Sequence, residues 1–288
     1  MKLGSSSGND YTNNSWTNNS VYVAKNNGSD GSGESGHSTT TWTIAGTAES
    51  GTSKTLDPGS GVSKTYSIVV TTKDVAGNSV TKTYTVKIDK AGPSAPTLTG
   101  GSTTYATSQK IKVSTASTDS GIGTVSYYEY YKASDSTAPT ASTSGTKVTT
   151  SDNSVTFSSN IAGHYVYFRG VDSLGNKGAW SSAARVYVDT VSPTVTAKNA
   201  SMTMTQGERS DTFASLFNTS WGGITTGTIT YSPSSYSNLG QLPVGTHTIT
   251  CTMSKNNGTS KSASVTVTVN AASKWCEECE RTRWVRIL

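Results

Sequence analysis

The chain has 288 residues, a formal net charge of +5 and a charged fraction of only 14%, against a usual charged fraction of about 25%. The length fits two or three domains that each bury a core. Basic residues outside the last fifteen positions are scattered, which argues against nucleic acid as a partner. No apolar run approaches the length of a membrane span, so we expect no membrane insertion.

About a third of the residues are Ser or Thr, a composition typical of disordered stalks or of β domains. Val, Ile, Tyr and Thr alternate with polar residues in many short runs, and helical periodicity is missing. The sequence therefore predicts an all-β fold. We expect three tandem β-sandwich domains in an elongated string.

The elements are predicted in chain order. Residues 1–15 are Ser-, Asn- and Gly-rich and predict a flexible lead-in. The first domain, residues 16–92, contains strands at 20–25 and 40–44 and a hairpin whose turn is 74–78. The second domain, residues 93–191, contains an aromatic strand at 124–132 and a similar turn at 172–176. Pro93 and Pro96 stiffen the linker between these domains.

The third domain, residues 192–270, has its hairpin turn at 255–258 and a short helix within 211–217. Residues 271–288 form a basic tail that contains Trp and Cys. The first two domains share a repeat. The turn 74–78 and the exit 88–93 recur about 100 residues later as 172–176 and 188–193. Modules of this kind are built to be concatenated.

Residues 121–193 resemble the immunoglobulin-like repeats found in tandem on large surface proteins of Gram-positive bacteria. The Gly121 turn, the strand ending at Tyr131, the run 164–176, the pair 180–181 and the exit 188–193 carry the resemblance. Residues 16–92 are similar to a distant copy, and 242–250 together with the run ending at 270 are similar to a type near the hyalin repeats. The resemblance implies immunoglobulin-like sandwiches of bacterial surface or phage structural proteins.

We expect a non-catalytic, extracellular stalk, adhesive or display segment of a bacterial surface protein. One alternative is a phage virion component, such as a tail fibre or capsid-decorating protein, because residues 1–8 lack the apolar core of a signal peptide. Another is the accessory region of a secreted carbohydrate-active enzyme. The expected partners are a surface glycan or another protein subunit, with self-association through edge strands and no cofactor.

No catalytic set emerges from the sequence. His37 lies in a Gly/Ser loop, His164 and His247 begin strands, and no spacing links the three. We therefore expect no enzyme. Tyr127, Tyr128, Tyr130 and Tyr131 lie on one strand, with Tyr127 and Tyr131 on one face and Tyr128 and Tyr130 on the other. They form a candidate ligand or assembly surface, although the strand propensity of tyrosine also explains them.

The metal-ligand candidates are of two kinds. Cys276 and Cys279 have the spacing of half a zinc site. Asp74 and Asp172 open the repeated turns, and Asp89 and Asp189 lie in the repeated exits of two domains, where oxygen ligands from neighbouring domains could hold calcium. Each junction offers one carboxylate in the sequence pattern, and an Asp that opens a β-turn needs no metal to explain it. The sequence therefore predicts no metal site, and these residues stay weak candidates.

Overall fold

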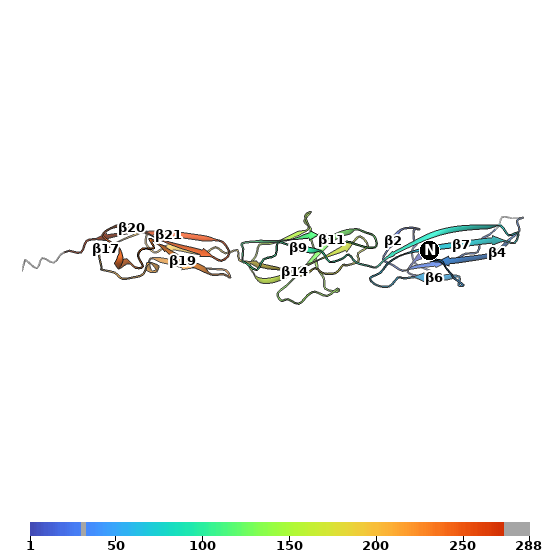
Figure 1. The fold of residues 1–288 in the computed structure, drawn as a ribbon, viewed down its shortest axis with the longest axis horizontal. Coiled ribbons are helices and arrows are strands. Elements are labelled where there is room, and N and C mark those ends of the chain that lie inside the picture. Colours follow the sequence, from blue (N-terminus) through green and yellow to red (C-terminus); the bar gives the residue numbers. More distant parts are fainter. Residues whose placement is uncertain (30–32, 274–288) are drawn as a thin grey trace, which may run out of the picture. The chain divides into compact units, whose positions relative to one another are not determined.

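The computed structural model describes residues 1–29 and 33–273. Within them the chain forms 21 strands and two single-turn 3-10 helices, so the predicted all-β class is confirmed (Figure 1). The chain divides into two compact units. The first contains Met1–Gly101, Lys110–Val155 and His164–Arg185; the second contains Ser102–Gln109, Thr156–Gly163 and the described residues from Val186 onward. The three-domain boundaries stay a prediction.

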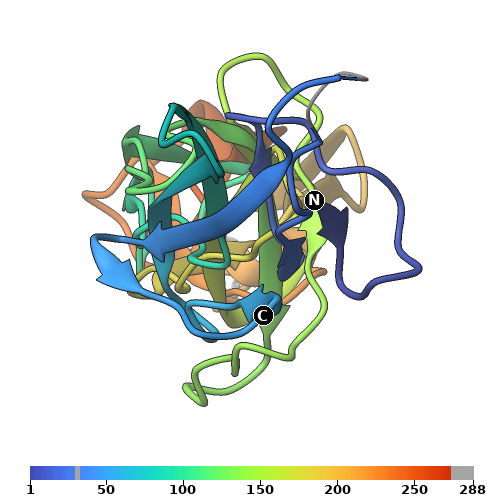
Figure 2. The same ribbon diagram turned by 90° about the vertical axis from the view of Figure 1, so that its right-hand side faces the viewer.

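The first unit begins with a sandwich of two sheets (Figure 2). One sheet has the order β1-β3-β6 and the other the order β2-β8-β7-β4-β5. Alternating side chains from both sheets, among them Val21, Trp42 and Val86, fill its core. The strands are β1 (Lys2–Leu3), β2 (Trp16–Thr17), β3 (Val21–Ala24), β4 (His37–Ile44), β5 (Thr47–Ala48), β6 (Ser53–Leu56), β7 (Ser63–Asp74) and β8 (Ser79–Asp89).

Residues 1–15 differ from the predicted flexible lead-in, because they pack on this sandwich. Leu3 of β1 pairs with Val21 of β3, and Tyr11 is only 7% exposed within the core. The Tyr11 hydroxyl accepts a hydrogen bond from Lys87 N at 2.9 Å. The apolar residues Met1, Leu3 and Tyr11 therefore outweigh the polar composition around them.

A second pair of sheets follows along the chain. One has the order β13-β10-β9 and the other β12-β11-β14-β15. Their strands are β9 (Thr97–Thr99), β10 (Gln109–Thr115), β11 (Val125–Ala133), β12 (Thr146–Lys147), β13 (Ser154–Phe157), β14 (Ile161–Asp172) and β15 (Ala184–Val188). In β10 buried and exposed residues alternate, whereas Val166–Asp172 of β14 is buried throughout. A strand buried on both faces must be covered on its outer side as well.

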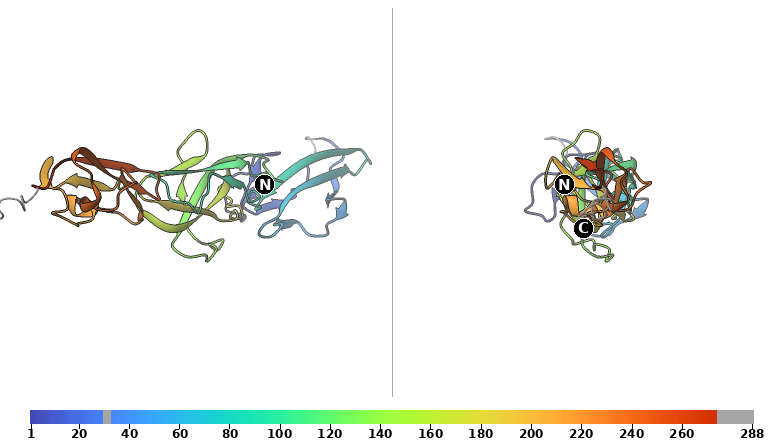
Figure 3. Two further views of the ribbon diagram at one scale, coloured as in Figure 1. Left: turned by 60° about the vertical axis from the view of Figure 1, so that its left-hand side comes forward. Right: turned by 90° about the vertical axis from the view of Figure 1, so that its left-hand side faces the viewer.

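The second unit ends with a further sandwich (Figure 3). One sheet pairs β16 with β18, and the other has the order β17-β21-β20-β19. Phe213, Leu239 and Met253 lie in its core, which all these elements enclose. The elements are β16 (Thr194–Ala197), β17 (Ser201–Thr205), η1 (Phe213–Leu216), β18 (Phe217–Ser220), β19 (Gly227–Ser232), η2 (Leu239–Gln241), β20 (Gly245–Lys255) and β21 (Ser260–Asn270). The short helix predicted within 211–217 is η1.

Three hairpin turns share one geometry, and the sequence predicts all three. In each, the backbone N–H of the opening residue donates to the carbonyl four residues later, from Asp74 to Asn78 at 3.0 Å, Asp172 to Asn176 at 3.1 Å and Lys255 to Thr259 at 2.8 Å. The fourth residue of each turn is a glycine with positive φ, at +91°, +88° and +85°. The three opening side chains therefore leave equivalent backbones.

Candidate metal centre

Asp89 is the last residue of β8 and is fully buried, with 0% exposure. The backbone N–H groups of Ala91 and Ile122 donate to its carboxylate at 3.1 and 2.7 Å, and the Ser63 hydroxyl also donates to it. All these donors are neutral. They orient the carboxylate without balancing its charge.

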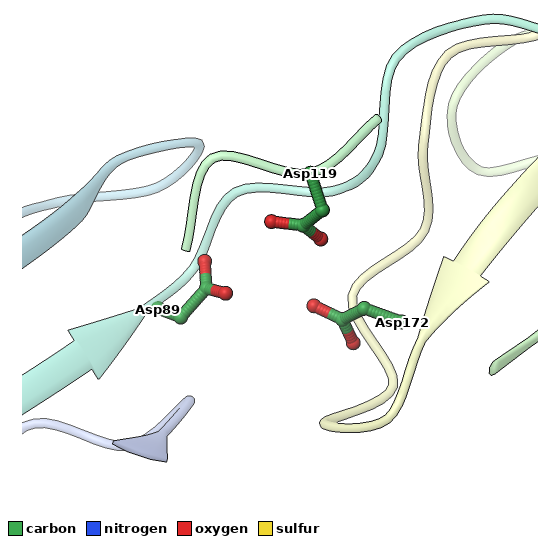
Figure 4. A group of neighbouring side chains, drawn as sticks. All are labelled: Asp89, Asp119 and Asp172. Atoms are coloured by element: carbon green, nitrogen blue, oxygen red, sulfur yellow. The ribbon is translucent and has the colours of Figure 1, made fainter. Parts of the chain in front are cut away.

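Two further aspartates face Asp89 from separate segments, as Figure 4 shows. Asp172 opens the turn after β14 and is 1% exposed, with its carboxylate held by Leu174 N, Asn176 N and Asn176 Nδ2. Asp119 lies in the loop between β10 and β11. Its Oδ1 accepts a hydrogen bond from the backbone N–H of Gly121 at 2.8 Å. Its Oδ2 is buried and accepts no hydrogen bond. We call Asp89, Asp119 and Asp172 the first aspartate site.

One oxygen from each of the three carboxylates lies within 4.8 Å of the others. Calcium–oxygen bonds of about 2.3–2.6 Å place opposite ligands about 4.6–5.2 Å apart, so the oxygens have the spacing of calcium ligands. No lysine or arginine contacts these carboxylates in any ion pair of the described residues. Burial, with the charges of Asp89 and Asp172, raises the pKa of Asp119. The site thus concentrates three acids without a protein cation.

Gly121 is required for this arrangement. A Cβ atom built on Gly121 would lie 1.9 Å from Asp89 Oδ2 and 2.1 Å from Asp89 Cγ, distances far inside van der Waals contact. The chain therefore passes over the Asp89 carboxylate at a point where no side chain fits. The sequence predicts the turn at Gly121 but not this close approach.

Asp189 follows β15 directly, in the equivalent exit, and has a different partner. Its side chain and that of Lys255 are both 0% exposed, and Lys255 Nζ lies 2.9 Å from Asp189 Oδ2. Thr225 donates to the same oxygen from its backbone N–H at 2.7 Å and its hydroxyl at 2.8 Å. Burial alone would raise the pKa of Asp189, but the hydrogen bonds from Lys255 and Thr225 hold it well below its usual range. We call this pair the Asp189 site.

The prediction of one carboxylate at each junction is wrong at the first junction. The sequence candidates were Asp74, Asp89, Asp172 and Asp189. Within the described residues the structure brings Asp89 and Asp172 together and adds Asp119, which the sequence did not single out. Their sequence separation hid this convergence, since it requires the end of one strand to meet two loops. Asp74, which opens the equivalent turn of the first sandwich, belongs to no such group within the described residues. Cys276 and Cys279 lie outside the described residues.

The three histidines lie on three different strands. His37 begins β4 rather than lying in a loop, and its Nε2 contacts Thr40 Oγ1 at 2.9 Å. Burial lowers the pKa of His164 in β14. His247 in β20 contacts the carbonyl of Pro243 at 2.7 Å. Each ring has its own local surroundings.

The tyrosine strand β11 lies under partial cover. Tyr128 is buried, and its hydroxyl accepts Ser117 N at 2.9 Å. Tyr127, Tyr130 and Tyr131 are half-buried, with Lys147 Nζ 4.4 Å from the Tyr127 ring centre. A ligand surface on these rings stays a prediction.

Sequence reasoning missed a buried ion pair beside these tyrosines. Arg169 is 1% exposed and donates from Nε and Nη2 to Glu129 Oε2 at 3.0 and 2.8 Å. The same guanidinium donates to the carbonyls of Ala141 and Thr143, both at 2.8 Å, and stacks on Trp180 at 4.2 Å. The loop that follows β11 therefore covers the outer face of β11 and β14.

No family model and no curated protein sequence matches the chain. Among solved structures it is similar to the fibronectin(III)-like modules of Clostridium thermocellum CbhA, at 16% identity over 61% of this chain and 95% of that one, with a TM-score of 0.28. A 1.5-MDa bacterial ice-binding adhesin is 16% identical over 80% and 86% of the two chains, with a TM-score of 0.33.

A third solved structure is the Bacteroides ovatus protein SGBP-B of a mixed-linkage glucan utilization locus, in complex with a mixed-linkage heptasaccharide. It is 13% identical over 90% of this chain and 66% of that one, with a TM-score of 0.20. Likenesses this low carry no argument about function. The β-sandwich fold therefore rests on the sheets and cores described above. Among the described residues, no helix is long and apolar enough to cross a membrane.

Proposed function

We propose that the chain is a non-catalytic structural segment whose first aspartate site binds a calcium ion. The supporting observation is the convergence of three carboxylates from three separate segments, with a buried oxygen of Asp119 that accepts no hydrogen bond. A bound ion would join the end of β8 to the loop before β11 and the turn after β14. The ion would hold these three segments together and would have a structural role rather than a catalytic one.

Oxygen chemistry favours calcium over other common metals. The site offers only carboxylates, which suit hard cations, and no thiolate or imidazole that would favour zinc. Magnesium requires near-ideal octahedral geometry at about 2.0–2.1 Å, with opposite ligands about 4.2 Å apart, whereas calcium accepts looser sets of six to eight oxygens. Waters and backbone carbonyls would complete the shell.

We place this segment outside the cell, as a stalk, adhesive or display region of a bacterial surface protein. Calcium sites of extracellular modules bind at about 10⁻⁴–10⁻³ M, and such concentrations are available outside cells. The repeated turns and exits support a string of modules, and the histidines on β4, β14 and β20 support no shared catalytic set.

Calorimetric titration of calcium into the full chain tests the site. We expect wild type to bind calcium and Asp172→Asn to bind about tenfold or more weakly, since a charged ligand is lost. Asp74→Asn is the matched control, because Asp74 opens the equivalent turn but lies in no carboxylate group of the described residues, so it should bind as wild type does. Wild type that releases no binding heat and does not sensitise terbium luminescence would contradict the site. Release of sugars from a polysaccharide by this chain would contradict the non-catalytic role.

A further inference from the structure

The Asp189 site is built on the same backbone scaffold as the first aspartate site. The N–H two residues after each aspartate donates to its carboxylate, from Ala91 and from Val191, both at 3.1 Å. The N–H of an isoleucine in a following loop also donates, from Ile122 at 2.7 Å and Ile224 at 3.1 Å. Each aspartate carbonyl accepts an asparagine Nδ2, from Asn176 at 2.9 Å and from Asn257 at 2.8 Å.

A glycine precedes each of these isoleucines and passes over the carboxylate. The Cβ built on Gly121 lies 1.9 Å from Asp89 Oδ2, and the one built on Gly223 lies 2.3 Å from Asp189 Oδ1 and 2.9 Å from Lys255 Nζ. Both sites therefore exclude a side chain at the same place.

The two sites differ at two equivalent positions. The turn-opening residue is Asp172 in one and Lys255 in the other, on turns with the same hydrogen bonds. The residue two positions before the glycine is Asp119 in one and Trp221 in the other. With its aspartates ionised, the first site sums to −3 (three carboxylates), whereas the Asp189–Lys255 pair sums to zero.

The Lys255 ammonium is fully coordinated by oxygen. Its three N–H groups match three acceptors, which are Asp189 Oδ2 at 2.9 Å, Val191 O at 2.7 Å and Gly222 O at 2.8 Å. Its side chain is 0% exposed. A buried lysine is tolerated only where its charge is paired and its donors are used, and both conditions hold here.

We propose that Lys255 is the permanent cation of the Asp189 site, occupying the place that a divalent cation takes in the first aspartate site. The turn-opening residue then decides between the two: aspartate recruits a metal ion, and lysine replaces it. The comparison with a bound ion rests on the proposed function, whereas the role of Lys255 within its own site does not.

The first test removes the ammonium. Lys255→Met keeps an unbranched side chain, one atom shorter, and leaves Asp189 buried without its cation, so we expect the melting temperature of the full chain's second unit to fall by roughly 10 °C or more. Hydrogen exchange in peptides covering 189–191 and 221–225 should rise with it. Lys261→Met is the control, because Lys261 lies exposed on β21. Equal stability of the two variants would overturn the proposal. So would an intact wild-type mass lower by one water, which would indicate an amide between Lys255 and Asp189.

The second test transplants the lysine. Asp172→Lys combined with Leu174→Asn reproduces the turn of the Asp189 site, in which Asn257 Oδ1 accepts Thr259 N at 3.0 Å. In calcium-free buffer we expect this variant to melt higher than wild type and to show no response to added calcium. A variant that melts lower than wild type and still binds calcium would overturn the proposal.

The outcomes separate the two claims. Wild type that fails to bind calcium contradicts the proposed function, yet the Lys255→Met result and the calcium-free melting of the transplant still decide the role of the lysine. Conversely, a wild type that binds calcium with Lys255→Met as stable as Lys261→Met retains the metal site and rejects the permanent cation.

Discussion

Asp119 is a carboxyl group whose protonation is affected by burial and by two neighbouring carboxylates. They raise the pKa of this residue above its ordinary value of 3.8. A folded-state pKa that is raised contributes stability that is fully present below the ordinary value and is lost as the pH rises through the folded value. Without metal, ionised Asp119 therefore works against folding near neutral pH.

Asp119→Asn should stabilise the chain in calcium-depleted buffer near neutral pH, and this advantage should shrink as the pH falls from about 8 to about 4. In calcium the order should reverse, because the variant lacks a charged ligand. Differential scanning calorimetry across this pH range measures both effects.

Asp135→Asn provides a control of opposite sign. Hydrogen bonds from Thr137 lower the pKa of this exposed aspartate, so its contribution is present above the ordinary value and is lost as the pH falls. The Asp119→Asn advantage in calcium-depleted buffer would be contradicted if it were constant across the pH range.

At the scale of elements, β11 and β14 are fastened to their covering loop by Arg169. This guanidinium joins Glu129 of β11 to the carbonyls of Ala141 and Thr143 in the loop. Lys177 contacts the same carboxylate at 3.5 Å, but its side chain is 45% exposed. One acid thus has a buried and an exposed basic partner, and solvent screens only the second.

Arg169→Met should lower the free energy of unfolding by about 3–5 kcal/mol, because it leaves Glu129 buried without its main partner. Lys177→Met should change it by at most about 1 kcal/mol. Urea denaturation gives both values, and limited proteolysis should cut residues 134–145 faster only in the first variant. Equal losses in the two variants would show that burial does not set the strength of these pairs.

These elements mark the limit of prediction from sequence. Alternation and turn chemistry predict the long strands and the three turns, since both act between residues close in the chain. Short strands such as β1, β2 and β5 carry too few alternating residues to be predicted in this way. The covering loop and Asp119 escape prediction because their role depends on distant packing. Glu129 and Arg169 sit in strand patterns where a charge normally marks the solvent face, and only the loop over them makes that face an interior.

At the scale of the whole molecule, the chain contains two aspartate sites that differ in the source of their positive charge. One gathers three carboxylates, and the other holds its own ammonium. We therefore expect calcium to act on the chain locally rather than uniformly. A ligand stabilises only the region whose folded form binds it.

Hydrogen exchange over the full chain should show this. Added calcium should slow exchange in peptides covering 86–92, 117–123 and 170–178, and leave residues 189–273 unchanged. Magnesium at the same concentration is the control and should have a smaller effect. Uniform protection along the chain would contradict a single local site.

The sandwiches also have a mechanical consequence. In the last sandwich β17 runs parallel to the closing strand β21 over five residue pairs, whereas in the first β2 runs parallel to β8 over two. When such strands are pulled by their outer ends, the force loads all their hydrogen bonds in shear at once, and none can unzip ahead of the others. The longer ladder should rupture at the higher force, so the last sandwich should withstand stretching better than the first.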